Sequence, residues 1–232
     1  MGDHMKNLRS TIILPSCAYP NNDTSPEREI ALRENIRHIQ GFLPDHRIIV
    51  ADNGTHAPDL CTDVTLFHDP LAFSKDPSIG ECRNLVNALQ SIEHSSNVIK
   101  LHARCKLSNT QAFRTFLRDN GEFLLVNRNI WARSSNRYGV LPFIDTRVFA
   151  VRADRLRRLI EITLATLEAD GGQFEQAMLS AVMRSPADCS ITFARGPFFP
   201  IFEGQSGHGR NYSSATARMR SHTKACIFRL GL

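Results

Sequence analysis

Cationic side chains and an imidazole occupy every second position from residue 100 to residue 106. They are Lys100, His102, Arg104 and Lys106. Alternate side chains of an extended strand share one face, so this spacing predicts three cations and an imidazole on one surface. Such charges repel one another unless an anion lies nearby. The pattern therefore indicates a phosphate-binding surface. The alternative is a strand at a sheet edge that cations protect from pairing.

Asp52 and Asn53 follow a strand-like apolar run, residues 48–51, and Gly54 comes next. A carboxylate at the end of a strand can accept hydrogen bonds from a ribose hydroxyl or a base N–H. The backbone N–H groups of an Asn-Gly turn can hold a polar ligand. An ordinary turn is the alternative, because Asn-Gly is a common turn dipeptide.

Gly80 and Arg83 lie where a turn opens an amphipathic helix, in the segment Ser78-Ile-Gly-Glu-Cys-Arg. Glycine lets a ligand approach the backbone closely, and a helix N-terminus attracts anions. Arg83 is one turn into the helix, at a reach suited to a phosphate. The alternative is a plain helix start with a solvated arginine.

Two carboxylates are candidates for a general base. Glu175 begins a helix after the glycine pair at 171–172, and Asp145 lies at a strand start after a long loop. We take Glu175 as the first choice and Asp145 as the second. For Glu175 the alternative is a favourable charge at a helix N-terminus.

A glycine-rich segment runs from Glu203 to Arg210. It is expected to close over a ligand as a lid and to supply His208 or Arg210 to a diphosphate. It is not a Walker loop, because the Gly-Lys-Ser/Thr ending is absent. A linker to a final helix is the alternative.

The elements that must position these side chains alternate between strands and helices. Hydrophobic periodicity predicts strands at 11–16, 47–52, 64–67, 98–102, 122–126, 143–151 and 189–194. It predicts helices from residue 26 to between 41 and 44, and at 79–92, 108–119, 153–169, 174–183 and 213–229. A single helical turn is expected at 59–63, and loops at 68–78, 127–142 and 196–209. The alternation predicts a mostly parallel sheet flanked by helices, an α/β fold.

Length and composition are those of one domain, since the chain has 232 residues of which 42% are hydrophobic. Residues 1–5 are expected to be an expression-tag remnant, residues 6–210 the catalytic domain, and residues 211–232 a basic tail. No run reaches the roughly 18 apolar residues of a membrane span. The six cysteines include no C-x-x-C pair. We expect free thiols in a reducing cytoplasm and no zinc site.

The excess of positive residues that gives the formal net charge of +5 lies in the last 28 residues of the chain. Residues 205–232 contain five Lys or Arg and no Asp or Glu, so the remaining residues balance at 23 of each sign. This asymmetry favours an anionic partner: a phosphate-bearing substrate, a lipid headgroup or nucleic acid. A solvated terminal helix is the alternative.

In this order, the segments resemble the GT-A glycosyltransferases, particularly the large inverting group. Val50-Ala-Asp52-Asn-Gly-Thr looks like that group's "Val-x-Asp-x-Gly-Ser" strand end. Residues 78–88 look like its "Asn-x-Gly-x-x-x-x-Arg-Asn-x-Gly/Ala" helix, one residue compressed. Gln173 to Leu179 is similar to the region that supplies the base. The resemblance covers roughly residues 10 to 210 and implies a single Rossmann-like GT-A domain.

The resemblance also implies a donor site. It places the base or ribose near Asp52, and the ribose or phosphate near Gly80 and Arg83. The remaining donor-binding candidates are Pro15, Ser16, Asn53, Lys100, His102, Arg104 and Arg210.

This chain departs from the family at its third landmark, where His102-Ala-Arg104 stands in place of the Asp-x-Asp metal motif. Mg²⁺ and Mn²⁺ want carboxylate oxygens, which this segment lacks. Cations can instead neutralise a leaving phosphate directly. We therefore expect no metal cofactor, with Mg²⁺ or Mn²⁺ kept as the alternative, and a CMP-sugar donor gains weight because it leaves one phosphate.

The expected function is transfer of a sugar to a glycan or lipid-linked acceptor in bacterial surface polysaccharide or lipopolysaccharide synthesis. The enzyme is expected to be like a hexosyltransferase or to use a CMP-sugar donor. A cytoplasmic place is expected, with peripheral contact to an anionic membrane through the tail. The alternatives are an inactive GT-A-like protein that binds nucleotide sugar or glycan, and a nucleic-acid-binding protein that uses the tail. Nucleic acid is the less favoured partner, because few aromatics interleave the tail's charges. A nucleotidyltransferase is disfavoured by the missing carboxylate pair.

Overall fold

The computed structural model describes residues 10–20, 25–60, 63–128, 142–184, 192–193, 199–204, 213–219 and 222–223. Its helices are α1 (Glu27–Phe42), η2 (Pro70–Ala72, a 3-10 turn), α2 (Pro77–Leu89), α3 (Thr110–Asn120), α4 (Ala153–Asp170) and α5 (Phe174–Arg184). Its strands are β1 (Thr11–Ser16), β2 (Arg47–Asp52), β3 (Val64–His68), β4 (Asn97–Leu101), β5 (Lys106–Leu107), β6 (Phe123–Arg128), β7 (Pro142–Arg152), β8 (Thr192–Phe193) and β9 (Phe202–Glu203).

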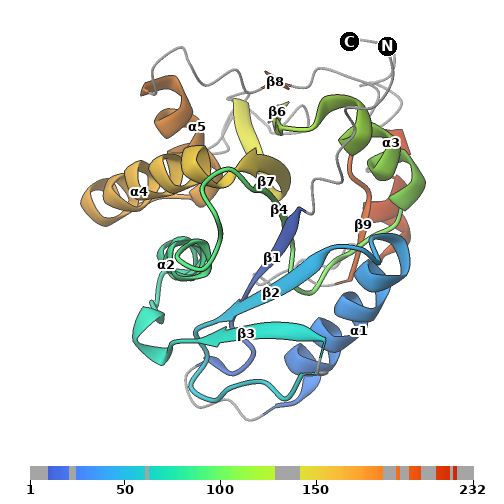
Figure 1. The fold of residues 1–232 in the computed structure, drawn as a ribbon, viewed down its shortest axis with the longest axis horizontal. Coiled ribbons are helices and arrows are strands. Elements are labelled where there is room, and N and C mark those ends of the chain that lie inside the picture. Colours follow the sequence, from blue (N-terminus) through green and yellow to red (C-terminus); the bar gives the residue numbers. More distant parts are fainter. Residues whose placement is uncertain are drawn as a thin grey trace.

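Seven strands form the central sheet in the order β3-β2-β1-β4-β7-β6-β8 (Figure 1). The pairs β3–β2, β2–β1, β1–β4 and β6–β8 are parallel, whereas β7 runs antiparallel to both of its neighbours. The expected α/β fold with a mostly parallel sheet flanked by helices is therefore confirmed.

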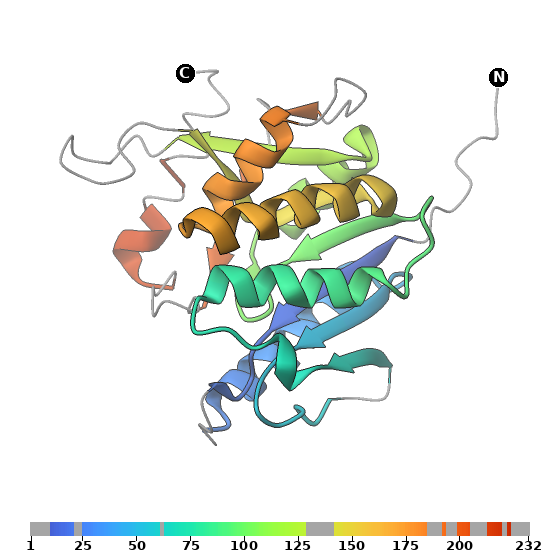
Figure 2. The same cartoon turned by 90° about the vertical axis from the view of Figure 1, so that its left-hand side faces the viewer.

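Helices cover both faces of this sheet. On one face α2, α4 and α5 lie side by side (Figure 2) and bury an apolar cluster that includes Ile13, Leu85 and Leu156. On the other face α1 and α3 bury a second cluster, which includes Leu14 and Phe113. Both clusters are almost fully closed to water, as a three-layer α/β domain requires.

Several expected boundaries differ in the structure. β4 ends at Leu101 rather than at residue 102, and a small second sheet joins β5 to β9. β6 and β7 extend into the two ends of the loop expected at 127–142, and residues 129–141 lie outside the described residues. Of the helical turn expected at 59–63, residues 59, 60 and 63 are not helical, and residues 61–62 lie outside the described residues. Of the helix expected at 213–229, the structure describes helical residues at 215–219 and 222–223.

Helices long and apolar enough to span a bilayer are absent from the described ranges.

Candidate functional site

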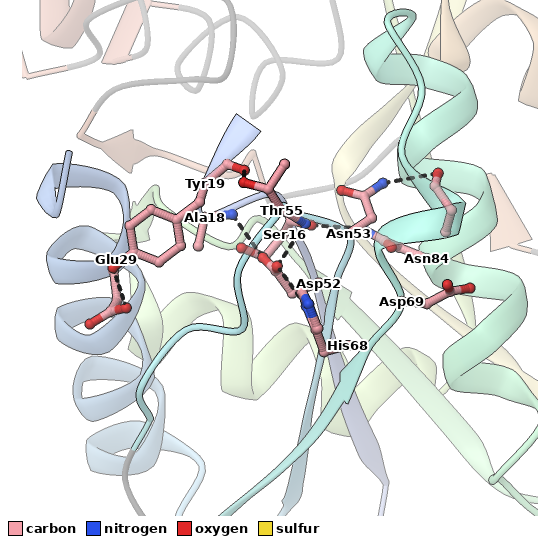
Figure 3. Close-up of polar contacts among 12 residues, drawn as sticks. Ser16, Ala18, Tyr19, Glu29, Asp52, Asn53, Thr55, His68, Asp69 and Asn84 are labelled. Carbon is pink, nitrogen blue, oxygen red and sulfur yellow. Dashed lines mark hydrogen bonds and ion pairs between the residues drawn. The ribbon is translucent and has the colours of Figure 1, made fainter. Parts of the chain in front are cut away.

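The carboxyl ends of β1 and β2 meet at one edge of the sheet, where Ser16 pairs in register with Asp52. The loops that follow these two strands are fastened to each other through the Asp52 carboxylate (Figure 3). Its two oxygens accept hydrogen bonds from the backbone N–H groups of Ala18 (2.7 Å) and Gly54 (2.8 Å). His68 Nδ1 lies 3.4 Å from the same carboxylate. Asp52 is only 1% exposed, so its main contacts are with the protein. Its role in the structure is to hold the loops after β1 and β2 together.

Tyr19 fastens the first of these loops at two further points. Its carbonyl accepts from Thr55 N (2.8 Å) and Thr55 Oγ1 (2.9 Å), and its hydroxyl donates to Glu29 on α1 (2.6 Å). A loop held in this way presents its backbone to a ligand in one conformation, which lowers the entropy cost of binding.

Asn53 and Gly80 form a close contact between the end of β2 and the first turn of α2. Asn53 Nδ2 donates to Gly80 O (3.2 Å) and to Ala72 O (3.2 Å). A Cβ at position 80 would lie 3.0 Å from Asn53 Nδ2, a tight contact that the Asn53 side chain would have to relieve by moving a few tenths of an ångström. The close neighbour of Gly80 is therefore the Asn53 side chain, and a role toward the donor stays a prediction for both residues.

Arg83 points toward α4 in the structure. Its Nη2 lies 3.0 Å from Glu168 Oε1, and both side chains are well exposed. The next residue, Asn84, is buried and donates from Nδ2 to Ser16 O (2.7 Å), which fixes α2 to the end of β1. Contact of Arg83 with a phosphate would require it to leave Glu168.

Lys100 lies on the α2 side of the sheet and is fully buried. Its Nζ is 2.6 Å from Glu81 Oε1 of α2 and also donates to the carbonyl of Thr146 in β7. The side chain of Lys106 is instead paired with Glu34 of α1 (2.9 Å). The expectation that the cations from 100 to 106 share one face is thus wrong, because β4 ends at Leu101 and the chain turns there.

His102 makes the turn that follows β4. Its Nδ1 accepts hydrogen bonds from the backbone N–H groups of Arg104 (3.1 Å) and Cys105 (3.1 Å). An acceptor role for Nδ1 places the proton of the neutral imidazole on Nε2. Asn35 of α1 donates to the carbonyls of His102 (2.7 Å) and Ala103 (3.0 Å). The His102 side chain thereby presents Arg104 on the α1 side of the sheet.

Asp145 is buried and held by a bidentate ion pair. Arg147 Nε and Nη2 lie 2.8 Å and 2.6 Å from its two oxygens. Burial alone would raise the pKa of the Asp145 carboxyl, but Arg147 outweighs it and leaves that pKa below its usual range. A base of lowered pKa binds a proton weakly, so the ion pair favours a positioning role for Asp145 over a role as general base.

Glu175 occupies the first turn of α5 and is half-buried. Burial raises the pKa of its carboxyl above the usual range, and the charges of Glu81 and Asp145 raise it further, against the opposing effect of Lys100. Ser78 Oγ, at the start of α2, accepts from Phe174 N (3.3 Å) and so ties the N-termini of α2 and α5 together. Glu175 therefore lies near Glu81, Asp145 and Lys100, and its role as a base stays a prediction.

The expected absence of a metal cofactor at this edge stays a prediction. Groups of three or more His, Cys, Asp or Glu that could bind one are absent from the described part of the chain. At the exit of β4, the Nδ1 of His102 is used by the turn and Arg104 adds positive charge. Arg210 and His208, which we expected in a lid, lie outside the described residues.

The described cysteines Cys17, Cys82 and Cys105 are free thiols. Burial raises the pKa of Cys17 and of Cys105 to about 11, and it raises that of Cys82 still more. Thiols of such high pKa hold their protons at neutral pH and do not act as nucleophiles.

Sequence reasoning missed three contributors to this edge: Arg28, Glu81 and Arg147. Arg28 donates to the carbonyl of Cys17 (3.5 Å), and the other two hold Lys100 and Asp145. Only the spacing of Asp145 and Arg147 along one strand was a signal in the sequence, since residues two apart share a face.

Family models and curated protein sequences give no match to this chain. Among solved structures, an active-site mutant of LgtC matches with a TM-score of 0.52 and 17% identity over 81% of this chain and 74% of that one. IspD of Francisella tularensis, a 2-C-methyl-D-erythritol 4-phosphate cytidylyltransferase, matches with a TM-score of 0.51 and 11% identity over 93% of this chain and 100% of that one. A structure of the galactosyltransferase LgtC with donor and acceptor sugar analogues matches with a TM-score of 0.49 and 18% identity, over 74% of this chain and 70% of that one. At these identities the similarity shows a shared GT-A-like fold.

Proposed function

We propose that this protein is a glycosyltransferase that moves a sugar from a nucleotide-sugar donor to an acceptor hydroxyl. The observation that carries the proposal is Glu175, a half-buried carboxylate of raised pKa at the end of the sheet where ligands of α/β folds bind. A general base needs a proton affinity near the working pH. The fold shared with LgtC, a galactosyltransferase, supports the assignment.

The proposed reaction is a single displacement. Glu175 accepts the proton of the acceptor hydroxyl as the oxygen of that hydroxyl attacks the anomeric carbon of the donor sugar. The bond from that carbon to the donor phosphate breaks, and the electron pair leaves with the nucleotide. Negative charge grows on the leaving phosphate, so a fixed cation such as Arg104 stabilises the transition state more than the bound donor. A single displacement inverts the anomeric configuration.

The donor nucleotide is placed over the loops that follow β1 and β2, with Pro15 and Ser16 below it. Asp52 and Asn53 shape these loops through backbone contacts. Arg104 follows from β4, with His102 as the residue that orients it. We propose transfer without a divalent cation, because the side chains at the exit of β4 are an imidazole and a guanidinium.

The proposed acceptor is a glycan or a lipid-linked sugar of a bacterial surface polysaccharide or lipopolysaccharide. The five cations in residues 205–232 suit contact with an anionic acceptor or membrane surface.

Nucleotidyl transfer is a second candidate, because the match to the cytidylyltransferase IspD extends over all of that chain. In such an enzyme a sugar phosphate oxygen would attack the α-phosphorus of a nucleoside triphosphate, which forms a nucleoside diphosphate sugar and releases pyrophosphate. Pyrophosphate release from CTP, UTP or GTP with a panel of sugar phosphates tests this candidate directly.

The first experiment is a thermal shift with UDP, GDP, CMP, TDP and ADP, each with Mn²⁺ and with EDTA. A shift by one nucleotide that survives EDTA is the expected result and identifies the donor class. The matching nucleotide sugar is then supplied to the wild type, Glu175→Gln and the control Glu161→Gln, which changes an exposed carboxylate of α4.

Loss of turnover in Glu175→Gln alone, with donor affinity retained, is the expected outcome. Equal turnover in Glu175→Gln and wild type would contradict the assigned base. Binding without turnover in every protein would indicate an inactive nucleotide-sugar-binding protein. A shift with Mn²⁺ only would contradict transfer without a metal.

A further inference from the structure

Two arginines, Arg28 and Arg104, flank the carboxyl end of β1 on the α1 side of the sheet. Both are half-buried, and neither forms an ion pair with a carboxylate in the residues the structure describes. Six other arginines of the described chain are paired with carboxylates: Arg33, Arg83, Arg118, Arg147, Arg152 and Arg155. The half-buried Arg157 has no carboxylate partner there but donates to two backbone carbonyls. A half-buried guanidinium without a counter-charge is costly unless an anion binds beside it.

α1 brings Arg28 into this position. Asn35, seven residues further along the helix, lies on the same face two turns away. Asn35 binds the carbonyls of His102 and Ala103, so this face of α1 is turned toward the exit of β4. From the first turn of α1, Arg28 Nη1 reaches the carbonyl of Cys17 (3.5 Å), directly after β1.

The backbone of Arg104 is fixed from two sides. His102 Nδ1 accepts from its N–H. On the other side a Cβ at Gly204, where φ is +108°, would lie 2.9 Å from its carbonyl oxygen. The guanidinium of Arg104 is close enough to Arg28 for their like charges to interact. Burial lowers the pKa of Arg104, and the charge of Arg28 lowers it further.

Ser16 adds a hydroxyl at the end of β1, one residue before Cys17, whose carbonyl accepts from Arg28. Side chains of Ile12 and Leu14 face the α1 side of the sheet, so Ser16 faces that side as well. The residue is 6% exposed, and its Oγ has no hydrogen-bond partner in the described part of the protein. A buried hydroxyl without a partner costs free energy that a bound acceptor oxygen would recover.

Asp52, a carboxylate near these groups, does not neutralise them. Its oxygens accept from the N–H groups of Ala18 and Gly54, and it forms no ion pair with Arg28 or Arg104. Two arginines without a carboxylate ion pair among the described residues, and a hydroxyl without a hydrogen-bond partner there, therefore lie around the carboxyl end of β1.

We propose that Arg28, Arg104 and the Ser16 hydroxyl bind the pyrophosphate group of a nucleoside diphosphate sugar directly, in place of a divalent cation. This inference rests on the proposed function. The pyrophosphate diester of such a donor carries two negative charges at neutral pH, which two guanidinium groups balance, whereas a CMP-sugar carries one. Planar guanidinium groups also suit bidentate contact with phosphate oxygens.

Calorimetric titration with sodium pyrophosphate in EDTA tests the site. The proteins are the wild type, Arg28→Gln, Arg104→Gln, Ser16→Ala and the control Arg37→Gln, which changes an exposed arginine of α1. Each of the first two changes removes a charged hydrogen bond and should weaken binding about 10- to 100-fold. Ser16→Ala should weaken it about 3- to 10-fold, because a neutral hydrogen bond is lost.

Arg104→Gln should also melt no lower than the wild type without ligand at low salt, because it removes a like-charge repulsion. Retained affinity in both arginine variants, or an equal loss in Arg37→Gln, would overturn the site. Failure of the wild type to bind pyrophosphate at millimolar concentration would do the same.

Nucleotide-sugar turnover in the same variants separates this inference from the proposed function. Turnover that is unchanged in Arg28→Gln and Arg104→Gln would overturn the pyrophosphate site while the transferase stands. Pyrophosphate binding that these variants lose, without turnover of any nucleotide sugar, would support the site and count against the transferase. Selective turnover of a CMP-sugar would overturn the diphosphate assignment.

Discussion

Lys100 is predicted to hold the sheet to α2 rather than to contact the donor, and Lys100→Met tests this. The side chain of Lys100 is 1% exposed, whereas its partner Glu81 is 32% exposed. Methionine keeps most of the buried volume, so packing changes little. The substitution leaves the carbonyl of Thr146, in a residue that is 4% exposed, without its donor. An unsatisfied buried acceptor costs about 1–3 kcal/mol.

Glu81 adds less to that cost, because a carboxylate that is one-third exposed can return to water and contributes about 0.5 kcal/mol. The expected loss for Lys100→Met is therefore about 2 kcal/mol in the free energy of unfolding. Glu81→Gln should cost more, about 3 kcal/mol, because it leaves a buried ammonium that cannot reach water. The double variant should lose less than the sum of the two.

Urea unfolding at pH 7, followed by far-UV circular dichroism, measures these differences. The control is Lys106→Met, since Lys106 pairs with Glu34 at the surface. It should change stability by less than about 0.5 kcal/mol. A loss below about 1 kcal/mol for Lys100→Met would refute the structural role. A larger loss for Lys100→Met than for Glu81→Gln would refute the argument that the unpaired buried ammonium is the more costly group. A large fall in nucleotide affinity for Lys100→Met, with stability unchanged, would restore the role predicted from the sequence.

Three further predictions concern the neighbouring groups. Because the folded state raises the pKa of Glu175, that group stabilises the protein below its unfolded pKa and loses this contribution as pH rises through its folded pKa. The melting temperature of Glu175→Gln should therefore rise relative to that of the wild type from pH 4 to pH 8. A difference in melting temperature that does not change with pH would contradict the raised pKa. Removal of the His102 imidazole (His102→Ala) leaves two backbone N–H groups without an acceptor and should cost about 2 kcal/mol in urea unfolding, part of which His102→Asn should restore. Asp145→Asn should cost about 3 kcal/mol at pH 7 by breaking the pair with Arg147. Because the Asp145 pKa is lowered in the folded state, that difference should shrink as pH falls below the unfolded pKa of an aspartate and toward its folded value, and a constant difference from pH 7 to pH 2 would contradict this.

Much of the sheet could be predicted from hydrophobic periodicity, because each strand carries an apolar run of its own length. β1, β2 and β4 lie within one residue of their expected bounds. Periodicity carries no information on direction, so the antiparallel β7 could not be predicted. The pairing of β5 with β9 joins two-residue strands almost 100 residues apart, and segments that short have no sequence pattern to detect.

The position of candidate site residues was easier to predict than their partners. Asp52, Gly80 and Glu175 all lie near the expected edge of the sheet. Their contacts depend on groups brought in from other elements, such as Ala18 N for Asp52 and Asn53 Nδ2 for Gly80. The rule that alternate side chains share a face also fails beyond the end of a strand. Since β4 ends at Leu101, the side chains of Lys100 and Lys106 lie on different sides of the sheet.

The placement of Lys100 and Arg104 on opposite sides of the sheet suits the proposed transferase better than a single cationic face would. Lys100 remains on the α2 side, where it pairs with Glu81 and leaves Glu175 with a raised pKa. The turn made by His102 carries Arg104 to the α1 side, beside Arg28. A base and a set of cations on one face would neutralise each other. With the sheet edge between them, a donor that lies across the strand ends can direct its phosphates to one side and its sugar to the other. The same argument requires Glu175→Gln to leave pyrophosphate affinity within about twofold of wild type, since no contact joins the two groups, and calorimetric titration of that variant measures this. A tenfold change would mean that the two groups act on one another, and that the sheet edge does not separate them.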